Sequence, residues 1–421
     1  MANKYIRAGA AGTGSGDNWT DAYASLAAAT WTRGNTYYVA DGAYAGRDFN
    51  TATSGTTTIT MKKATASDHG TETGWVSTYG DGVATFSSAF TLSTAYHILD
   101  GITGGGPGAW NSGFGFEVSS TSSSGIIQVA SANNIVRHVK LIGASTESTN
   151  DAIYTSNLAG DNTFTLSYAW ISTCGRCPVF MDGHDSTAAT GEQIFEYVYV
   201  EDYHAGASIH GEILSASQGN VPDMTFRYCL FEQVQSTGGI MWDNASDHNK
   251  RCNLYGNVFY RPSGVGWTAP NGVIGGWTGG GGEDCYNMRV YHNTFINIDV
   301  KVFFNAFTRA GNLLAGNNLF YNCSGQIEYN YFSSDYSHYI NSGGTNGETN
   351  GTSAGSGDPF EDYVNRDFRV TANTTAGATL GAPYTTDMYG NTRTTLTRGA
   401  VEYSTGADTT PPAVPTGVTI S

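Results

Sequence analysis

Two short stretches decide the fold, LYGNVF at residues 254–259 and VYHNTF at residues 290–295. Each has an apolar side chain at both ends and an Asn between them. The same phrase, with Asn or a small apolar residue at its middle position, recurs at intervals of 24 to 36 residues. Its copies are Val136/Val139/Leu141, Leu166/Ala169/Ile171, Phe195/Val198/Val200, Phe226/Cys229/Phe231, Leu254/Asn257/Phe259, Val290/Asn293/Phe295 and Leu314/Asn317/Leu319.

A second strand phrase keeps step with the first. Since a unit of about 30 residues is too short to bury its own apolar face, it must stack on neighbouring copies of itself. Like strands of successive units then pair at roughly 4.8 Å, and equivalent positions form ladders. Asn tolerates the left-handed backbone of a sharp bend, and stacked amides bond along a column. The second phrase runs through Ile153, Phe180, Ile213, Ile240, Val273 and Phe303, and the predicted Asn ladder is Asn257, Asn293 and Asn317.

Composition supports an all-β solenoid. The 421 residues include 55 Gly and 26 Tyr, and only 13% are charged, which favours short strands joined by turns over helical bundles. A hydrophobic content of 39% is too high for a disordered chain. The sequence therefore predicts one long folded core.

The charge pattern limits the partners. With 20 basic and 36 acidic residues the formal charge is −16, and no basic patch for nucleic acid or an anionic membrane is present. No apolar run is long enough for membrane insertion, and the N-terminal residues lack the apolar stretch of a secretory signal. We expect no metal or cofactor, except that Ca²⁺ stays open as a bridge between an acidic surface and a polyanionic sugar.

The sequence predicts three segments. Residues 1–35 form an N-terminal cap in which an Ala-rich helix over residues 19–31 covers the open end of the first coil. Residues 36–403 form the solenoid with its loop inserts. Residues 404–421 resemble a linker and first strand leading towards a fibronectin-like or immunoglobulin-like module.

The repeats resemble the right-handed parallel β-helix superfamily of pectate lyases, polysaccharide-active enzymes and phage tailspikes. The resemblance covers most of the chain, including the phrases quoted above, the opening segment GTGSGDNWTDAYASLAAA and the closing segment DPFEDYVNRDFRVTANT. It implies a right-handed parallel β-helix with an N-terminal capping helix, a carbohydrate partner and a virion or extracellular location. The metal-binding Asp pattern of pectate lyases is not matched. The resemblance names a fold and no reaction.

Acidic and imidazole side chains gather near the ends of the second strand on consecutive coils. A coil step of roughly 5 Å would place carboxylates at separations that suit glycoside hydrolysis, with a neighbouring His moving a proton. The alternative is that these residues cap turns and face solvent. The candidates are Asp182, Glu212, Asp243 and His210 for catalysis, with His184 for substrate binding.

Aromatic and basic residues supply further binding candidates. Trp242, Trp267 and Trp277 lie in or beside the longest inserts, where exposed indoles would stack on sugar rings; alternatively they pack the loops onto the core. An outward ladder presents Arg227 and Tyr255, although a cross-strand ion pair between Glu196 and Arg227 is the simpler interpretation. The full ladder is Arg137, Ser167, Glu196, Arg227, Tyr255 and Tyr291.

The six cysteines include the pair Cys174 and Cys177, whose spacing fits a redox pair, half a zinc site or a tight disulfide. Cys229 occupies an inward ladder position and is expected to be a buried apolar side chain.

Three functional hypotheses remain. The first is a virion-associated receptor-binding protein that binds, and in some cases cleaves, a cell-surface polysaccharide, and it predicts a homotrimer. The second is a secreted polysaccharide hydrolase, with a lyase less favoured. The third is a structural fibre or capsid-decoration protein without catalysis.

Overall fold

The computed structural model of the chain describes most of the residues from Met1 to Ser404. The described ranges are 1–155, 160–181, 190–205, 209–216, 221–235, 238–242, 249–267, 272–275, 285–303, 310–325, 327, 332–343 and 347–404.

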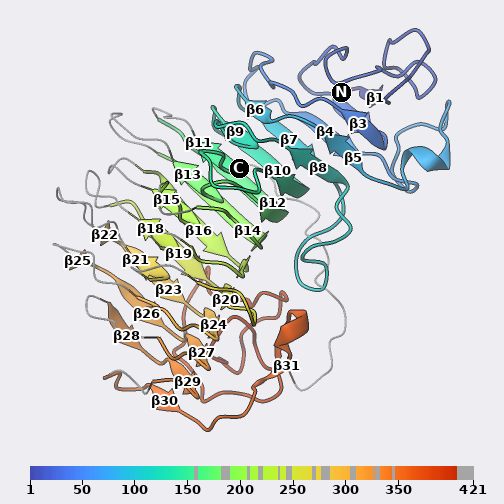
Figure 1. Cartoon of the computed structure of the whole chain (residues 1–421). Coiled ribbons are helices and arrows are strands. Elements are labelled where there is room, and N and C mark those ends of the chain that lie inside the picture. Colours follow the sequence, from blue (N-terminus) through green and yellow to red (C-terminus); the bar gives the residue numbers. More distant parts are fainter. Residues whose placement is uncertain are drawn as a thin grey trace.

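The fold is all-β and is built on long parallel sheets, in which each strand pairs with its counterpart one repeat later (Figure 1). One column of the main sheet consists of β1 (Asn3–Ile6), β2 (Thr36–Val39), β4 (Ile59–Lys63), β7 (His97–Asp100), β10 (Asn134–Ile142), β12 (Phe164–Thr173), β14 (Glu192–Val200), β16 (Asp223–Arg227), β19 (Cys252–Tyr255), β23 (Met288–Tyr291), β26 (Leu314–Gly316) and β28 (Ser333–Asp335).

The second column of the main sheet joins the first through the long strands β10, β12 and β14, which span both columns. Its shorter strands are β3 (Gly42–Tyr44), β5 (Ala84–Phe86), β8 (Phe116–Ser119), β17 (Leu230–Phe231), β20 (Val258–Tyr260), β24 (Thr294–Ile296), β27 (Leu319–Tyr321), β29 (His338–Ile340) and β30 (Thr352–Ser353).

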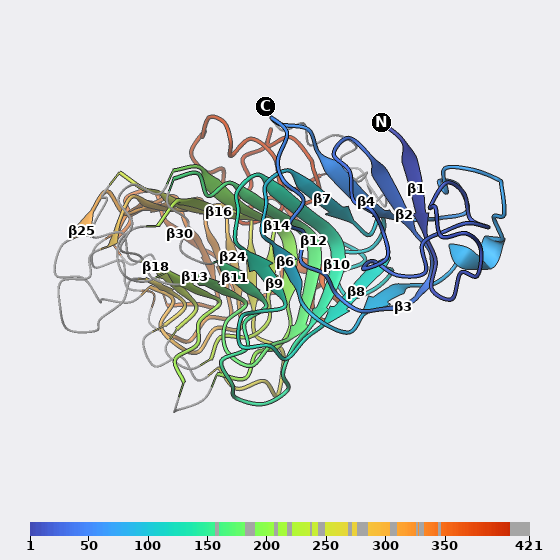
Figure 2. The same ribbon diagram turned by 90° about the horizontal axis from the view of Figure 1, so that it is seen from above.

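A second parallel sheet lies opposite the long strands, across the core (Figure 2). It contains β6 (Phe90–Leu92), β9 (Ile127–Val129), β11 (Ile153–Thr155), β13 (Val179–Met181), β15 (Leu214–Ala216), β18 (Ile240–Trp242) and β21 (Ile274–Gly275). The remaining elements are the parallel pair β22 (Cys285–Tyr286) and β25 (Ala310–Gly311), the antiparallel pair β31 (Phe360–Asp362) and β32 (Asp367–Val370), and the short 3₁₀ helices η1 (Ser77–Tyr79) and η2 (Tyr363–Asn365).

The core is a continuous stack of apolar side chains between the sheets. Phe259 and Phe295 lie 5.1 Å apart between ring centroids, and Phe295 and Phe320 lie 4.9 Å apart, each pair nearly parallel. These distances match the spacing of neighbouring strands, because each ring sits at the same position of its repeat. The arrangement is compatible with the predicted solenoid.

The observed register confirms most of the predicted first phrase and corrects its last copy. Val290 pairs with Ala315, and Phe295 pairs with Phe320, so the last copy is Ala315/Asn318/Phe320 and begins one residue later than predicted. The predicted copy was displaced by one residue because Leu314 and Leu319 are also apolar, although Leu319 packs on the outer face. The second phrase is likewise shifted by one residue at Val179, Leu214 and Ile274, which replace Phe180, Ile213 and Val273.

A ladder of buried Asn side chains ties consecutive repeats together, and its third member is Asn318 rather than the predicted Asn317. The Asn293 Oδ1 atom accepts from the Asn257 backbone N–H at 3.1 Å and from its Nδ2 at 3.0 Å. The Asn293 Nδ2 in turn donates to the Leu254 carbonyl at 2.8 Å, and Asn318 Oδ1 accepts from the Asn293 N–H at 2.9 Å. Each amide therefore pairs backbone groups at the bend that would otherwise be buried without partners.

The left-handed backbone predicted at this bend belongs to the residue before the ladder. Tyr168, Tyr197 and Tyr228 have φ values of 50°, 53° and 58° and stack their rings on the outer face. Gly256 takes the next position with φ 66°, and a Cβ there would lie 2.6 Å from the Tyr228 ring. Glycine is required at this level because the tyrosine ring occupies the space of a side chain.

The predicted N-terminal capping helix is wrong. Residues 19–31 form turns, and Tyr23 makes a parallel bridge to Ile6 in β1. Its N–H donates to the Tyr5 carbonyl, and its carbonyl accepts from the Arg7 N–H, both at 2.9 Å. These main-chain bonds cover the edge of β1, and they are incompatible with helical bonding at Tyr23. The apolar residues that suggested a helix, including Trp19 and Leu26, are buried instead by the turns.

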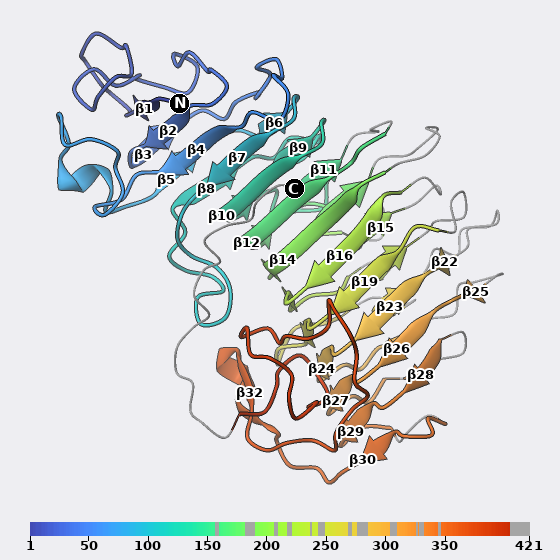
Figure 3. The same ribbon diagram turned by 180° about the vertical axis from the view of Figure 1, so that it is seen from behind.

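The C-terminal segment, residues 356–403, folds back over the outer face of the main sheet and lies over β24 and β27 (Figure 3). The Gly399 N–H donates to the Asn317 carbonyl at 2.7 Å, and the Ala400 N–H donates to Thr294 Oγ1 at 2.8 Å. Phe360 and Phe368 pack there with outward-facing aromatic residues in a second apolar cluster. This segment supplies one wall of the cleft described below.

The Asn ladder leads to a stability prediction. Asn293→Ala removes the bonds to Asn257 and Leu254 and leaves buried backbone groups without partners, so we expect a loss of about 2–4 kcal/mol in the free energy of unfolding. Denaturant unfolding measures this loss. The exposed Asn50, whose amide bonds only to Asp48 in the described structure, provides the control variant Asn50→Ala. Equal effects of the two variants would contradict the role of the ladder.

Buried histidines predict a second, pH-dependent effect. Burial, reinforced by Arg33, lowers the pKa of His97 to about 4, and the side chain is 1% exposed. Below pH ~6.5 the unfolded chain binds a proton that the folded chain rejects, so stability falls as pH drops towards 4 by on the order of 3 kcal/mol. His97→Gln should reduce the slope of unfolding free energy between about pH 7 and about pH 5. An unchanged slope would exclude His97 as its source.

Candidate functional site

Four of the predicted site residues, Asp182, His184, Asp243 and Trp277, lie outside the described residues. Their roles therefore remain predictions.

The structure separates the two predicted catalytic residues that it does describe. His210 is exposed, whereas Glu212 is completely buried. The Glu212 N–H donates to the Cys177 sulfur at 3.4 Å, and the Cys177 Sγ lies 3.8 Å from Glu212 Oε2. The Glu212 carboxylate thus lies in the core beside a thiol.

The two described tryptophans of the predicted binding set are also buried. Trp242 has no exposed surface and donates through Nε1 to the Tyr286 carbonyl at 3.2 Å. Trp267 is 6% exposed and donates through Nε1 to the Glu232 carbonyl at 3.2 Å. Neither ring offers an open face for a sugar, which agrees with the packing alternative.

The predicted outward ladder is confirmed in register, with Arg227 paired to Glu196 on one side and to Tyr255 on the other. Arg227 donates to Glu196 Oε2 through Nε at 2.8 Å and Nη2 at 2.5 Å, and through Nη1 to the Tyr255 hydroxyl at 3.2 Å. Tyr255 is only 2% exposed because Tyr384 of the C-terminal segment packs against it. These contacts support the ion-pair interpretation over a role in ligand binding.

All six cysteines are buried free thiols, and each lies within the described chain. The Cys174 and Cys177 thiols have pKa values well above the ordinary range because both are buried. A redox role needs an accessible thiolate, so the spacing of this pair reflects core packing. Cys229 occupies the inward ladder position as predicted.

The outer face of the main sheet carries a cleft of about 400 Å³ whose lining includes two carboxylates, Glu201 and Glu232. Val200 and Phe231 are the paired last residues of β14 and β17, and both point into the core. The next residue of each repeat is a glutamate in the cleft wall. The Glu232 N–H donates to the Val200 carbonyl at 3.0 Å, which fixes the two glutamates on adjacent levels.

Each glutamate accepts a hydrogen bond from an aromatic residue of the preceding level. Trp170 Nε1 donates to Glu201 Oε2 at 3.0 Å, and the Tyr199 hydroxyl donates to Glu232 Oε2 at 2.7 Å. The Trp170 and Tyr199 rings are stacked with centroids 6.3 Å apart and an interplanar angle of 11°. The donor–acceptor arrangement is therefore repeated from one level to the next.

The C-terminal segment contributes the cation of the cleft. Arg366 Nε donates to Glu232 Oε1 at 2.7 Å, and its Nη2 donates to Glu232 Oε2 at 2.9 Å. The same Nη2 lies 2.8 Å from the Tyr199 hydroxyl oxygen. Glu232 is 4% exposed, so this two-pronged ion pair compensates for the cost of burying its charge.

The two carboxylates have different electrostatic surroundings. Burial raises the pKa of Glu201 above its ordinary value, although the Trp170 hydrogen bond and Arg366 oppose that shift. Glu232 instead has a direct cationic partner. The cleft thus combines a carboxyl group that retains its proton to higher pH with a carboxylate held by an arginine, which is the division needed for acid–base chemistry.

The remaining walls combine aromatic, hydroxyl and amide groups, as in sugar-binding clefts. Tyr363 and Val364 of η2 lie on one side, and Val364 is 63% exposed at the rim. The other lining residues are Tyr260, Pro262, Ser263, Val265 and Asn297.

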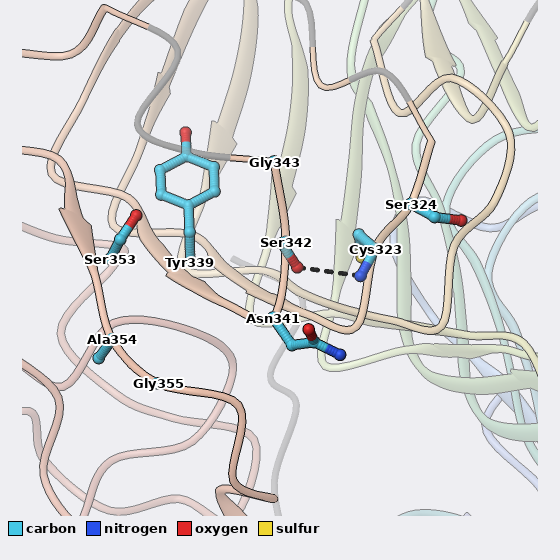
Figure 4. A pocket seen from close by; sticks show the side chains of 9 residues that line it. All are labelled: Cys323, Ser324, Tyr339, Asn341, Ser342, Gly343, Ser353, Ala354 and Gly355. Atoms are coloured by element: carbon cyan, nitrogen blue, oxygen red, sulfur yellow. Dashed lines mark hydrogen bonds between the residues drawn. The ribbon is translucent and has the colours of Figure 1, made fainter.

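A second cleft, of about 470 Å³, lies near the end of the stack at β29 and β30 and is lined mainly by small polar residues (Figure 4). Ser342 Oγ accepts from the Cys323 N–H at 2.9 Å. Burial raises the pKa of the Cys323 thiol to about 12. No carboxylate, His or Lys lines this cleft among the described residues, so the Glu201–Glu232 cleft is the better candidate for proton transfer.

Two other kinds of site are absent from the part of the chain that the structure describes. No group of three or more His, Cys, Asp or Glu side chains there is arranged to hold a metal ion. No helix in the same ranges is long and apolar enough to cross a membrane.

Comparison of the sequence with protein-family models found no match, and comparison with curated proteins found none either.

Sequence reasoning missed Glu201 and Glu232, although the repeat contains the signal for them. Each follows directly after the closing apolar residue of its phrase, Val200 or Phe231, and therefore falls in one column. The contribution of Arg366 has no such signal, because it lies 134 residues beyond Glu232 and outside the repeats.

The hydrogen bond from Trp170 yields a prediction about Glu201. Trp170→Phe removes a bond that favours the charged carboxylate, so the pKa of Glu201 should rise further. A ¹³C NMR titration of labelled glutamate carboxyl groups measures the pKa of Glu201, and the loss of one signal in Glu201→Gln assigns it. The distant Trp75→Phe is the control. A fall in the pKa, or no change, would show that this bond does not act on Glu201.

Proposed function

We propose that this chain is a right-handed parallel β-helix that binds a polysaccharide and hydrolyses it in the cleft of Glu201 and Glu232. The repeats and their parallel pairing support the fold, together with the resemblance to the pectate-lyase and tailspike superfamily. The cleft supports the reaction class. Hydrolysis needs one carboxyl group to protonate the leaving oxygen and a second to act on the sugar or on water.

One observation carries the proposal, namely two carboxylates on adjacent levels of one cleft, of which only Glu232 bonds directly to Arg366. Burial raises the pKa of Glu201, which suits a general acid, whereas Arg366 and Tyr199 hold Glu232 as an acceptor. A lyase would need a base placed to remove a proton beside a neutralised uronate carboxylate. The paired glutamates suit hydrolysis better.

The cleft also supports binding of a sugar. The half-buried Tyr363 lines it, and the amide of Asn297 and the hydroxyl of Ser263 add hydrogen-bonding groups. With a net charge of −16, a neutral polysaccharide meets no electrostatic penalty at this surface.

For the setting we propose a virion-associated or extracellular protein that contacts a cell-surface glycan and assembles as a homotrimer. Six buried free thiols fit folding in a reducing compartment, such as a host cytoplasm in which virions assemble. This observation favours the receptor-binding hypothesis over a secreted enzyme.

The test combines a glycan array with a reducing-end assay on the polysaccharides that bind. Glu201→Gln and Glu232→Gln should each lower turnover at least about 100-fold while binding persists, because acid–base catalysis contributes about 10²–10⁴-fold. Glu361→Gln, an exposed glutamate near η2 that does not line the cleft, is the control.

Binding without turnover by the unmodified protein would indicate an adhesin and overturn the hydrolase proposal. Binding to no glycan would favour the structural hypothesis. Formation of an unsaturated product, detected by ultraviolet absorbance, would identify a lyase.

A further inference from the structure

The C-terminal segment is anchored to the outer face of the main sheet (Figure 3) by Asn317, which follows β26 and is 1% exposed. The Asn317 Oδ1 atom accepts from the Ala378 N–H at 2.8 Å, and its Nδ2 donates to the Ala378 carbonyl at 2.8 Å. The Asn317 carbonyl accepts from the Gly399 N–H at 2.7 Å. Because Ala378 supplies both a donor and an acceptor, it fixes which end of the amide is oxygen and which is nitrogen.

The second Nδ2 hydrogen of Asn317 is available to His292, whose Nε2 lies 3.1 Å from Nδ2. An amide nitrogen only donates, so Nε2 must accept and the imidazole is neutral, with its proton on Nδ1. His292 follows β23 and is 2% exposed. A proton added to Nε2 would therefore set two donors against each other at a buried contact.

A second buried histidine lies beneath the same segment. His338 of β29 is 5% exposed, and its Nδ1 lies 2.6 Å from Thr352 Oγ1. Arg398 of the C-terminal segment donates through Nη1 to the same oxygen at 2.9 Å. Since Thr352 Oγ1 accepts from the arginine, its hydroxyl proton is available to His338 Nδ1. Protonation of Nδ1 would remove this acceptor and place a second cation beside Arg398.

The charged groups that face the two rings favour the neutral form. Each ring faces an arginine of the C-terminal segment, and each arginine has two acidic groups near it. The groups are Arg393 with Asp387 and Glu402 beside His292, and Arg398 with Asp335 and Glu348 beside His338. Burial, reinforced by the arginines, lowers the pKa of His338 to about 4 and the pKa of His292 well below its ordinary value.

We infer that the C-terminal segment is an acid-released latch, which lies on the sheet while His292 and His338 are neutral and leaves it when they are protonated. The segment also carries Arg366, so its release would withdraw that arginine from Glu232. The inference concerns docking of the segment, and its test does not depend on hydrolysis of a sugar in the cleft.

The direction of the effect follows from proton binding. In the released state both histidines bind protons below about pH 6.5, whereas in the docked state they do so only at lower pH. Docking is therefore strongest above about pH 6.5 and weakens as pH falls. For His338, a pKa lowered from 6.5 to about 4 changes the release equilibrium roughly 60-fold between about pH 7 and about pH 4.5. His292 changes it in the same direction.

The first experiment follows hydrogen–deuterium exchange of the full chain by mass spectrometry, with each rate corrected for the intrinsic effect of pH. Peptides over residues 376–400 should lose protection at least about 50-fold between about pH 7 and about pH 4.5, while peptides over β12 and β14 keep theirs. Unchanged protection of residues 376–400, or equal loss across the whole chain, would overturn the inference. Retained protection of the peptide that contains Arg366 would overturn the link to the cleft.

The second experiment repeats this measurement with the double variant His292→Gln and His338→Asn. The new amide oxygens stand near the positions of Nε2 and Nδ1 and accept hydrogen bonds but do not titrate, so the segment should stay protected at about pH 4.5. His97→Gln, which removes a buried histidine of β7, is the control and should release its segment as the unmodified chain does. Equal release by the double variant would contradict the latch.

A third measurement needs no substituted protein to be docked. A long-range ¹H–¹⁵N NMR spectrum of the unmodified chain at about pH 7 should show His292 with its proton on Nδ1 and His338 with its proton on Nε2. Loss of one signal in each single variant assigns the two rings. A charged ring, or the opposite tautomer, at either position would overturn the inference even if the double variant failed to dock.

Discussion

In-register pairing of each repeat with the next is the interaction on which the rest of this structure depends. A parallel strand pair holds equivalent residues one strand spacing apart, and repeating it carries every side chain into a column. The phenylalanine stack in the core, the buried amide ladder and the tyrosine stack on the outer face are three results of the same constraint. None of them could form if one level slipped by a residue, because alternate side chains would exchange core and solvent.

The cleft depends on the same pairing. Glu201 and Glu232 are close because Val200 and Phe231 are paired, and Trp170 and Tyr199 reach them because the donors are paired as well. A repeated scaffold thus places two glutamates on adjacent levels without long loops. The difference between them comes from outside the repeats, because Arg366 of the C-terminal segment contacts Glu232 directly.

Sequence reasoning found the repeats, because apolar side chains that recur at a fixed spacing bury themselves best by stacking one unit on the next. It was weaker wherever two neighbouring residues were both apolar, as with Leu314 and Ala315, since only packing decides which one faces the core. It was wrong about residues 19–31, where Tyr23 forms a parallel bridge to Ile6 of β1 in place of helical bonds. It also assigned tryptophans to sugar binding too readily, because the large apolar ring of Trp242 packs in the core.

The site was harder to find for a physical reason. The repeat predicts which residues share a column, so the adjacent positions of Glu201 and Glu232 could have been predicted from the sequence. Contact between segments far apart in the chain leaves no periodic trace, and Arg366 could not have been assigned to Glu232 before the fold was known. Of the predicted residues near the ends of the second sheet that the structure describes, Glu212 is buried beside Cys177, whereas His210 is exposed.

The distance along the chain between Glu232 and Arg366 has a consequence for biosynthesis. Chains emerge from the ribosome N-terminus first, and stacked repeats are able to order as they appear. The ion pair joins residues 134 positions apart, so Glu232 acquires its partner only after every later repeat has been translated and the C-terminal segment has docked. A nascent chain therefore carries folded repeats before the Glu201–Glu232 cleft has its arginine.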